Sequence, residues 1–475
     1  MFDAAAFIAT AAIPPCSADS TTIAVIGAGF SGTLTALHLL RRCPATTRVI
    51  LIERGPQHGS GLAYGTPHPG HLLNVPAGKM SAFPDRPADF LHWLQQQPGI
   101  EATAGTFAPR GVYGAYVRSL LQATLQDPVY RGRLLLMRNS VVDMDQAERA
   151  VRLTCAQGEP FEADLVVLAT GNLPPCPLPI GDGSFFETPF YRHDPWAPDA
   201  LTNLDPAAPV LLMGTGLTMI DTVIALLDQG HTGPIQAVSR RGLLPHRHKP
   251  AAPLAAGSAP YPTRLAALVR FLRAQAKAAE ANGSDWRAVV DALRPFTADL
   301  WQALSIPEQR RFLRHARPWW DIHRHRVAGP VAARIDAARA SGQLQVQAGR
   351  LQSFGDAGDR ATVTIQPRRG HTAVTWAAAR VINCTGPGIE CGRLTDPLLL
   401  ALFRNGMVRP DPLGMALDVA PSGAVRGADG SLSRRVFAVG PLTRAVFWEM
   451  TAVPDIRRQC ELLAQHLTAL VTPPR

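Results

Sequence analysis

Long apolar runs and paired cysteines are missing from this sequence. No stretch of about 18 uninterrupted apolar residues occurs, so no membrane-spanning helix is expected. The seven cysteines are scattered, without a Cys-x-x-Cys pair or a Cys/His cluster at metal-binding spacing, which excludes dithiol reductases and zinc modules. We therefore predict no metal site, and the cysteine usage favours the cytoplasm.

A positively charged start is also absent. Residues 1–20 are Ala-rich and contain Asp3 but no Lys or Arg, so they lack the start of a secretory signal and are expected to form a disordered leader. The remaining length of the 475-residue chain predicts two or three domains, and its composition predicts a soluble globular protein. The net charge of +10 comes mostly from dispersed Arg, which favours anionic small molecules over nucleic acid.

The first motif is a glycine-rich turn between a predicted strand and a predicted helix. Residues 23–26 form a buried-strand pattern, the sequence Gly-Ala-Gly-Phe-Ser-Gly follows at 27–32, and residues 33–42 have helical spacing. Such a turn lets a pyrophosphate approach the backbone at a helix N-terminus. The next predicted strand, 48–52, ends in Glu53, whose carboxylate suits the hydroxyls of an adenosine ribose. This unit predicts an FAD site.

A second unit of the same kind follows at 209–241. Residues 209–213 and 235–238 are predicted strands, and Gly214-Thr-Gly216 is the turn before a predicted helix at 219–227. Met219 stands where the third glycine is expected, so this helix must lie further from its strand or begin differently. The second strand ends in Ser-Arg-Arg at 239–241, and guanidinium groups suit a 2′-phosphate. We predict NADPH here, with NADH and a solvated strand end as alternatives.

Later strands indicate how the domains are interleaved. Residues 141–144, 151–154 and 165–168 look like β segments, and the last runs into Ala-Thr-Gly at 169–171. Strands at 380–384 and 436–439 again run into glycine turns and look built for the first sheet. The expected fold is α/β with two Rossmann-type domains: a discontinuous FAD domain at 21–205 and 376–475, and an inserted NAD(P)H domain at 206–375 with a helical insertion at about 260–340.

Several long strings carry a family resemblance that extends over most of residues 22–460. Among them are "GAGFSGTLTALHLL", "GLAYGTPHPGHLLNVPAGKMSAFPDRPADFLHWL", "VLLMGTGLTMID", "RPWWDIHRHRVAG" and "GPLTRAVFWEMTAVPDIR". The chain resembles bacterial FAD/NAD(P)-binding proteins related to class B flavin monooxygenases and amino-acid N-hydroxylases. The resemblance implies FAD, NADPH, O2 and a small-molecule substrate, hydroxylated through a C4a-peroxyflavin.

Two segments are expected near the flavin. Residues 61–80 are rich in Gly and Pro and predict an irregular loop, in which Tyr64 could stack on the flavin ring. Asn74 could bond a ring atom or merely cap loop backbone. Residues 453–470 predict an amphipathic helix with Pro454 in its first turn and Thr451 as its cap; in related flavoproteins such a helix points at the flavin.

The predicted FAD contacts are Gly27, Gly29, Phe30, Ser31, Gly32, Glu53, Arg54, Tyr64, Asn74, Val142, Thr170, Gly171, Gly440 and Pro441. The predicted NADPH contacts are Gly214, Gly216, Leu217, Thr218, Arg240 and Arg241.

The predicted helical insertion ends in a basic and aromatic cluster, "RHARPWWDIHRHR" at 314–326. It could clamp a substrate carboxylate, through Arg317 for example, meet the NADPH phosphates, or be a basic surface helix with Trp319 and Trp320 in the core. Glu449 is the candidate polar group facing substrate, unless it pairs with a buried Arg such as Arg444.

Three functions are compatible with these patterns. The first is an NADPH-using, FAD-dependent monooxygenase acting on a small polar substrate that bears an amine. The second is an FAD-dependent NAD(P)H oxidoreductase without oxygen insertion. The third is a non-enzymatic redox sensor or partner-binding flavoprotein, which would show no turnover.

Overall fold

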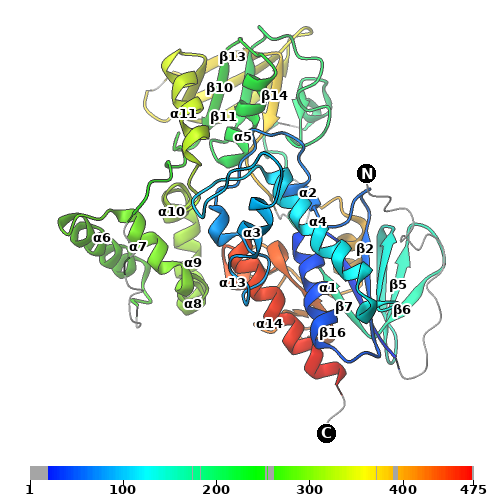
Figure 1. Ribbon diagram of the computed structural model, residues 1–475. Coiled ribbons are helices and arrows are strands. Elements are labelled where there is room, and N and C mark those ends of the chain that lie inside the picture. The colour runs from blue at the N-terminus through cyan, green and yellow to red at the C-terminus, as the bar shows by residue number, and fades with distance from the viewer. Residues whose placement is uncertain are drawn as a thin grey trace.

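The computed structural model describes residues 20–173, 175–181, 183–251, 254, 261–370, 372–388 and 394–472, so the predicted leader at 1–19 lies outside it. Two β-sheets organise this part of the chain (Figure 1). The first has the order β15-β16-β7-β1-β2-β3, parallel except for the β15–β16 pair. Its strands are β1 (Thr21–Ile26), β2 (Thr47–Glu53), β3 (Leu134–Arg138), β7 (Leu165–Leu168), β15 (Ala424–Arg426) and β16 (Leu432–Ala438).

The second sheet has the order β13-β12-β11-β10-β9-β14-β8, with an antiparallel meander at its β13 end. Its strands are β8 (Tyr191–Arg192), β9 (Val210–Met213), β10 (Ile235–Ser239), β11 (Leu344–Asp356), β12 (Ala361–Pro367), β13 (Val374–Ala378) and β14 (Arg380–Asn383). A small antiparallel sheet contains β4 (Val141–Gln146), β5 (Val151–Cys155) and β6 (Phe161–Ala163). The predicted α/β fold with two Rossmann-type units is therefore confirmed.

The two units repeat one order of elements. Each unit begins with a strand, a glycine turn, a helix and a second strand. A long crossover then leads to a third strand, which is followed by an antiparallel meander and a fourth, parallel strand. The glycine turns have the same geometry: Gly27 has φ +98° and Gly214 has φ +110°. A Cβ at either glycine would lie 2.5 Å from a carbonyl oxygen at the end of the fourth strand, that of Ala169 or of Cys384. Close approach of backbone to backbone thus requires glycine at both positions.

This repeat corrects one prediction from the sequence. The strand expected at 380–384 is β14, but it pairs with β9 in the second sheet and not with the first sheet. It completes the second unit as β7 completes the first. Only the strand expected at 436–439, now β16, returns to the first sheet, beside β7. An isolated buried-strand pattern carries no information on which of two similar sheets it will join.

Helices cover one face of each sheet. On the first sheet, the apolar core lies under α1 (Phe30–Arg42), α3 (Asp89–Gln95), α4 (Arg110–Gln126) and α14 (Val453–Val471). The small sheet and α12 (Pro397–Arg404) cover its other face. On the second sheet, α5 (Leu217–Asp228) and α11 (Gly329–Ala340) form the main covered face.

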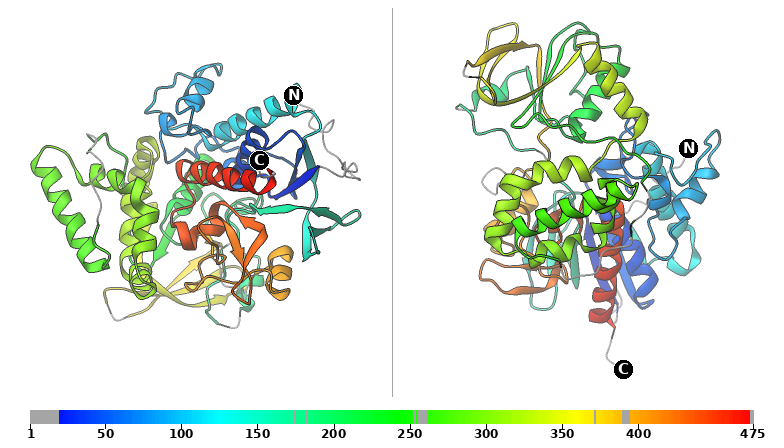
Figure 2. Two further views of the ribbon diagram at one scale, coloured as in Figure 1. Left: turned by 90° about the horizontal axis from the view of Figure 1, so that it is seen from below. Right: turned by 90° about the vertical axis from the view of Figure 1, so that its left-hand side faces the viewer.

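The crossover from β10 to β11 holds the predicted helical insertion. It contains α6 (Leu265–Ala281), α7 (Trp286–Leu293), η5 (Arg294–Phe296), α8 (Thr297–Ala303), α9 (Ile306–Arg311), the π-helical η6 (Phe312–Ala316) and α10 (Arg317–Arg324). Although the chain enters it from the second sheet, it lies beside the first sheet's domain, near α13 (Arg444–Phe447) and α14 (Figures 1 and 2). Trp301 fixes this contact, because its Nε1 donates to the carbonyl oxygen of Ala445 at 2.7 Å.

Helix α14 matches its prediction closely, with Pro454 in the first turn. The predicted cap is wrong, however: Ala452, in extended conformation, is the N-cap, and no side chain in the described part of the chain caps the helix. The loop predicted at 61–80 is irregular except for α2 (Gly61–Tyr64) and η2 (Ala77–Lys79).

Candidate functional site: two dinucleotide turns

The first turn leaves a helix N-terminus without a capping side chain. Helix α1 begins at Phe30 after the N-cap Gly29, and its first turn holds no acidic residue. The amides of the first turn, including those of Ser31 and Gly32, have no acceptor within the helix. A Cβ at Gly32 would lie 1.8 Å from the Gly27 carbonyl oxygen, so the helix can stand close to its strand only with glycine there. This geometry suits a pyrophosphate.

Glu53 lies beside that turn. Its Oε2 accepts from the amide of Ala28 at 2.8 Å, and its Oε1 accepts from that of Gly55 at 2.8 Å. A carboxylate oxygen has more than one lone pair, so both oxygens retain capacity for ribose hydroxyls. The neighbouring Arg54 is exposed and donates to Asp396 Oδ2 at 3.0 Å.

An orphaned hydroxyl marks the end of β7. Thr170 Oγ1 is buried, and no hydrogen-bond partner for it occurs among the described residues. Its Cα lies 3.2 Å from the position that a Cβ of Gly27 would take, so the hydroxyl belongs to the same turn. Gly171 follows with φ +76°. A buried polar group without a partner is costly, and a bound FAD would supply one.

The C-terminal segment that begins at Gly440 packs against the same turn. Gly440 has φ +74°, and a Cβ there would lie 2.5 Å from Ser31 Oγ. The Gly440 amide donates to Gln459 Oε1 at 2.8 Å, which ties the η8 turn (Gly440–Thr443) to α14. The sequence-predicted residues Ser31, Gly440 and Pro441 are thus brought together, although they come from opposite ends of the chain.

The other predicted flavin contacts lie in three different parts of the structure. Tyr64 is buried in the aromatic core, edge-on to Phe30 with 5.9 Å between ring centroids, and burial raises its pKa to about 12. The carbonyl oxygen of Asn74 accepts from His248 Nε2 at 2.9 Å, a contact between the two domains that the sequence did not indicate. Val142 is half-buried in β4, on the small sheet.

The second turn repeats the first with one difference. Helix α5 begins at Leu217 after the N-cap Gly216, again without a capping side chain or an acidic first turn, and Thr218 lies in that turn. Because α1 and α5 begin at the same position of their turns, the predicted different start is wrong. Met219 is fully buried where α1 has Gly32, so the other alternative, a helix that lies further from its strand, stays a prediction.

Strand register identifies the residue that replaces Glu53. Ile26 pairs with Ile52, and Met213 pairs with Val238, so Ser239 occupies in the second unit the place of Glu53 in the first. Ser239 Oγ lies 2.9 Å from Thr215 Oγ1. The second site therefore lacks the carboxylate that would repel a phosphate at this position.

Two arginines follow Ser239. Arg240 is exposed. Arg241 is half-buried; its guanidinium lies 5.9 Å from the ring centroid of Trp319, and its Nη2 donates to the His315 carbonyl oxygen at 3.4 Å. Their role toward a 2′-phosphate stays a prediction.

Glu449 lies in a buried ion pair. Its Oε1 accepts from Trp320 Nε1 at 2.5 Å and its Oε2 from Arg324 Nε at 2.9 Å. Burial acts to raise the pKa of this carboxyl, but Arg324, His325 and the Trp320 bond together hold it below its ordinary value. Trp448 and Glu449 both have positive φ, 50° and 26°, a strained conformation for residues other than glycine.

The alternative that Glu449 pairs with a buried arginine is confirmed, but that arginine is Arg324. The suggested Arg444 does not pair with it, because its Nε donates to the Met415 carbonyl oxygen at 2.7 Å.

The basic cluster at the end of the insertion divides into buried and exposed parts. Arg324 and Arg326 are buried, whereas the side chain of Arg317 is half-exposed and its Nε lies 3.4 Å from Asp321 Oδ2. Trp319 is 47% exposed, which rules out the alternative that anchors it in the core. Trp320 is half-buried and held by Glu449.

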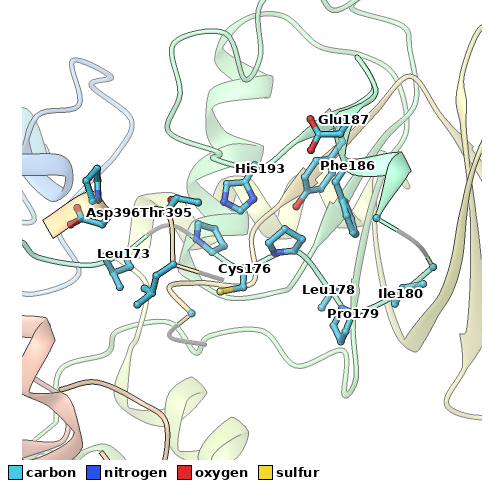
Figure 3. Close-up of a pocket in the computed structure, with 18 of the residues that line it drawn as sticks. Leu173, Cys176, Leu178, Pro179, Ile180, Phe186, Glu187, His193, Thr395 and Asp396 are labelled. Carbon is cyan, nitrogen blue, oxygen red and sulfur yellow. The ribbon is translucent and has the colours of Figure 1, made fainter. Parts of the chain in front are cut away.

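A cavity of about 740 Å3 lies where the chain leaves β7 and β14 (Figure 3). Leu173 and Asp396 lie toward one end of it, and Phe186 and Ile180 toward the other. Arg54, next to the proposed ribose ligand Glu53, also lines it. Sequence patterns did not indicate this cavity, because its walls come from two connections far apart in the chain.

Among the described residues, no group of His, Cys, Asp or Glu is placed to hold a metal ion. Within that same part of the chain, no helix is long and apolar enough to cross a membrane.

Fold and turns together define a protein with two dinucleotide-binding Rossmann units, one inserted in the other. Residues 24–173 match the model of a family described as FAD-NAD(P)-binding. A search of curated proteins finds no match for the chain.

Among solved structures, the fold is similar to that of an ornithine N-hydroxylase from Kutzneria sp. 744, with a TM-score of 0.65 at 13% identity, covering 95% of this chain and 100% of that one. It is equally similar to L-lysine 6-monooxygenase from Pseudomonas syringae, with a TM-score of 0.65 at 16% identity and the same coverage. A cadaverine monooxygenase from Erwinia amylovora, solved with FAD, gives a TM-score of 0.64 at 12% identity over 95% of this chain and 96% of that one. The predicted resemblance to class B flavin monooxygenases is confirmed at the level of the fold.

Proposed function

We propose that this protein is an FAD-dependent, NADPH-using monooxygenase that hydroxylates a small substrate bearing an amine. The observation that carries the proposal is the asymmetry of the two turns: Glu53 in the first and Ser239 with Arg240 and Arg241 in the second. The solved structures of similar fold suggest the reaction class, since they are an ornithine N-hydroxylase, an L-lysine 6-monooxygenase and a cadaverine monooxygenase.

The first unit would hold FAD. The amides of Phe30, Ser31 and Gly32 would bind its pyrophosphate, Glu53 its ribose, and Thr170 Oγ1 would gain a partner for its buried hydroxyl. When bound, FAD supplies hydride acceptance and oxygen activation, while the protein supplies position and electrostatics. The N-terminus of α14 would place a positive dipole end toward the flavin.

The second unit would hold NADPH. Its pyrophosphate would meet the uncapped N-terminus of α5 beyond Gly216, and the exposed Arg240 would bind the 2′-phosphate with Arg241 beside it. The domains proposed for the two cofactors follow the two sheets, with the correction that β14 belongs to the NADPH domain.

Two side chains were expected at the substrate. Arg317, half-exposed with a weak contact to Asp321, stays our proposed ligand for a substrate carboxylate. Both oxygens of Glu449 already accept hydrogen bonds, so we propose that it holds Trp320 and Arg324 in place and acts on substrate only through them.

Stopped-flow reoxidation tests this function. The NADPH-reduced holoenzyme is mixed with O2, and flavin absorbance is followed into the near-ultraviolet. We expect a transient near-ultraviolet species before the oxidised flavin spectrum returns, and product formation when amine substrates are screened. If the oxidised flavin instead returns directly and releases stoichiometric peroxide, both without substrate and with each amine tested, the protein is an oxidoreductase without oxygen insertion.

A further inference from the structure

Helix α5 has a buried anchor in the other domain. Arg110, the first residue of α4, has its Nη2 2.7 Å from Oδ2 of Asp221 in the second turn of α5. The exposed fractions of the two side chains are only 16% and 8%. The two residues belong to different domains, so this ion pair connects the FAD unit to the helix that would bind the NADPH pyrophosphate.

A second contact holds the same residue. His71 Nε2 lies 3.1 Å from the carbonyl oxygen of Asp221, which can only accept, so Nε2 donates and Nδ1 accepts from Thr66 Oγ1 at 2.9 Å. Burial is the main reason why the pKa of His71 falls to about 4, so the ring is neutral at physiological pH. Both the side chain and the backbone of Asp221 are therefore bound by the FAD unit.

The segment that makes this contact leads directly into the proposed flavin loop. Gly70 lies so close to α5 that a Cβ there would be 2.8 Å from the side chains of Ile224 and Asp228. The Arg110 amide donates to the His71 carbonyl oxygen at 2.8 Å, so the loop and α4 form one unit. Three residues beyond His71 the chain reaches Asn74, which is bound by His248 of the second domain.

The surroundings of Asp221 show how much the pair matters. Burial raises the pKa of Asp221 to about 6, and Arg110 opposes this shift because it favours the ionised carboxylate. Arg110 is the cation beside the carboxylate, and both side chains are largely buried. Removing either partner leaves a buried charge uncompensated, which loosens the contact instead of merely weakening it.

We propose that Arg110 and Asp221 are positioning residues that fix the NADPH-binding helix relative to the flavin loop and so set the rate of hydride transfer. This proposal rests on the proposed function, because it takes FAD in the first unit and NADPH in the second. The pair touches neither phosphate turn, and it lies five residues beyond Gly216 along the chain. Loss of the ion pair should therefore misplace the nicotinamide without removing the groups that bind NADPH. Small misplacements of reacting groups lower reaction rates by about 100-fold.

Anaerobic stopped-flow reduction of the FAD holoenzyme by NADPH tests the proposal, since it separates the limiting reduction rate from the NADPH dissociation constant. We expect Asp221→Asn and Arg110→Gln to lower the limiting rate by about 10-fold to 100-fold. FAD content and the NADPH dissociation constant should change by less than about threefold. Arg110→Lys, which keeps the charge, should restore part of the rate.

The matched control is Asp336→Asn, which is the same chemical change at another ion pair. Asp336 on α11 pairs with Arg247, both residues belong to the second domain, and their side chains are exposed by 62% and 43%. This variant should reduce FAD at the wild-type rate.

Hydrogen exchange supplies a readout that does not depend on turnover. In Asp221→Asn, with and without bound cofactors, amides of residues 68–74 and 108–112 should exchange faster, while those of α1 keep their wild-type protection. Unchanged exchange, an unchanged reduction rate, or a loss confined to NADPH affinity would overturn the proposal. If NADPH fails to reduce the wild-type flavin at all, the proposed function fails, and the positioning role fails with it.

Discussion

Nε of Arg324 donates to Oε2 of Glu449 at 2.9 Å, and both side chains are almost fully buried, with exposed fractions of 8% and 5%. Arg324 ends the helical insertion, and Glu449 precedes α14 of the first sheet's domain. The chain thus inserts a group of helices into the second unit and then attaches them to the first.

Breaking this pair should destabilise the protein strongly. Glu449→Gln leaves the buried Arg324 with only the more distant carboxylate of Asp455, whose Oδ2 lies 3.9 Å from Nη2, and the loss of a buried partner costs about 3–5 kcal/mol. Chemical denaturation of the holoenzyme measures it. Arg247→Gln is the control, because the pair of Arg247 with Asp336 is exposed by 43% and 62% and should contribute less than about 1 kcal/mol. Equal effects of the two variants would contradict the role of Glu449.

The contribution of Glu449 should depend on pH. Its pKa in the folded protein lies below the ordinary value of 4.5, so ionised Glu449 stabilises the fold at pH values above 4.5. The stabilisation is lost as the pH falls through the folded-state value. The difference in unfolding free energy between wild type and Glu449→Gln should therefore be constant above about pH 5.5 and shrink in acid. A difference in unfolding free energy that grows in acid would show that the pKa of Glu449 in the folded protein is not lowered.

Alanine in place of glycine should have different effects in the two turns. A Cβ at Gly32 would lie 1.8 Å from a backbone oxygen, so Gly32→Ala should lose FAD or fail to fold. At Gly216 no atom of the described residues, apart from its own chain neighbours, lies within 4 Å of the added Cβ, so Gly216→Ala should fold and retain FAD. Because a phosphate would lie close to that backbone, NADPH binding alone should weaken, as measured by titration of the holoenzyme.

The residues after β10 should choose between NADPH and NADH. Arg240→Ala should weaken NADPH binding by about tenfold, since it removes a charge-assisted bond worth about 1.5 kcal/mol, and should leave NADH binding unchanged. Ser239→Glu places a carboxylate where Glu53 stands in the first unit and should reverse the preference toward NADH. Steady-state KM values for both nucleotides measure the effect. Equal losses for the two nucleotides would mean that these side chains do not meet the 2′-phosphate.

Thr170 offers a test of the FAD site in the apoprotein. Its Oγ1 is buried without a partner in the described structure, so Thr170→Val should not lower the thermal stability of FAD-free protein. The same change should weaken FAD binding severalfold, because the cofactor would lose a hydrogen bond. FAD release measured by fluorescence, beside melting of the apoprotein, separates the two effects.

Much of the fold was accessible from local patterns. The strand, glycine turn and helix of each unit were predicted within a few residues, because a buried-strand run followed by closely spaced glycines has few alternative conformations. The contrast between Glu53 and Ser239 with its arginines was also readable, and strand register confirms that the two positions correspond.

Contacts between distant segments could not be read in that way. The sequence placed β14 in the wrong sheet, and it suggested Arg444 instead of Arg324 as a buried partner of Glu449. One alternative for the basic cluster also put Trp319 in the core, whereas the structure leaves it 47% exposed. The first two errors are choices among chemically similar partners, namely two sheets with equal strand patterns and several arginines.

The sequence by itself determined that this protein has two dinucleotide turns of different charge, since those features depend on a few neighbouring residues. Only the tertiary structure decided that Arg110 meets Asp221 and that Arg324 meets Glu449, which stands 125 residues further along the chain. Ion pairs of this kind form where packing of whole helices buries both charges, and burial is a property of the assembled fold.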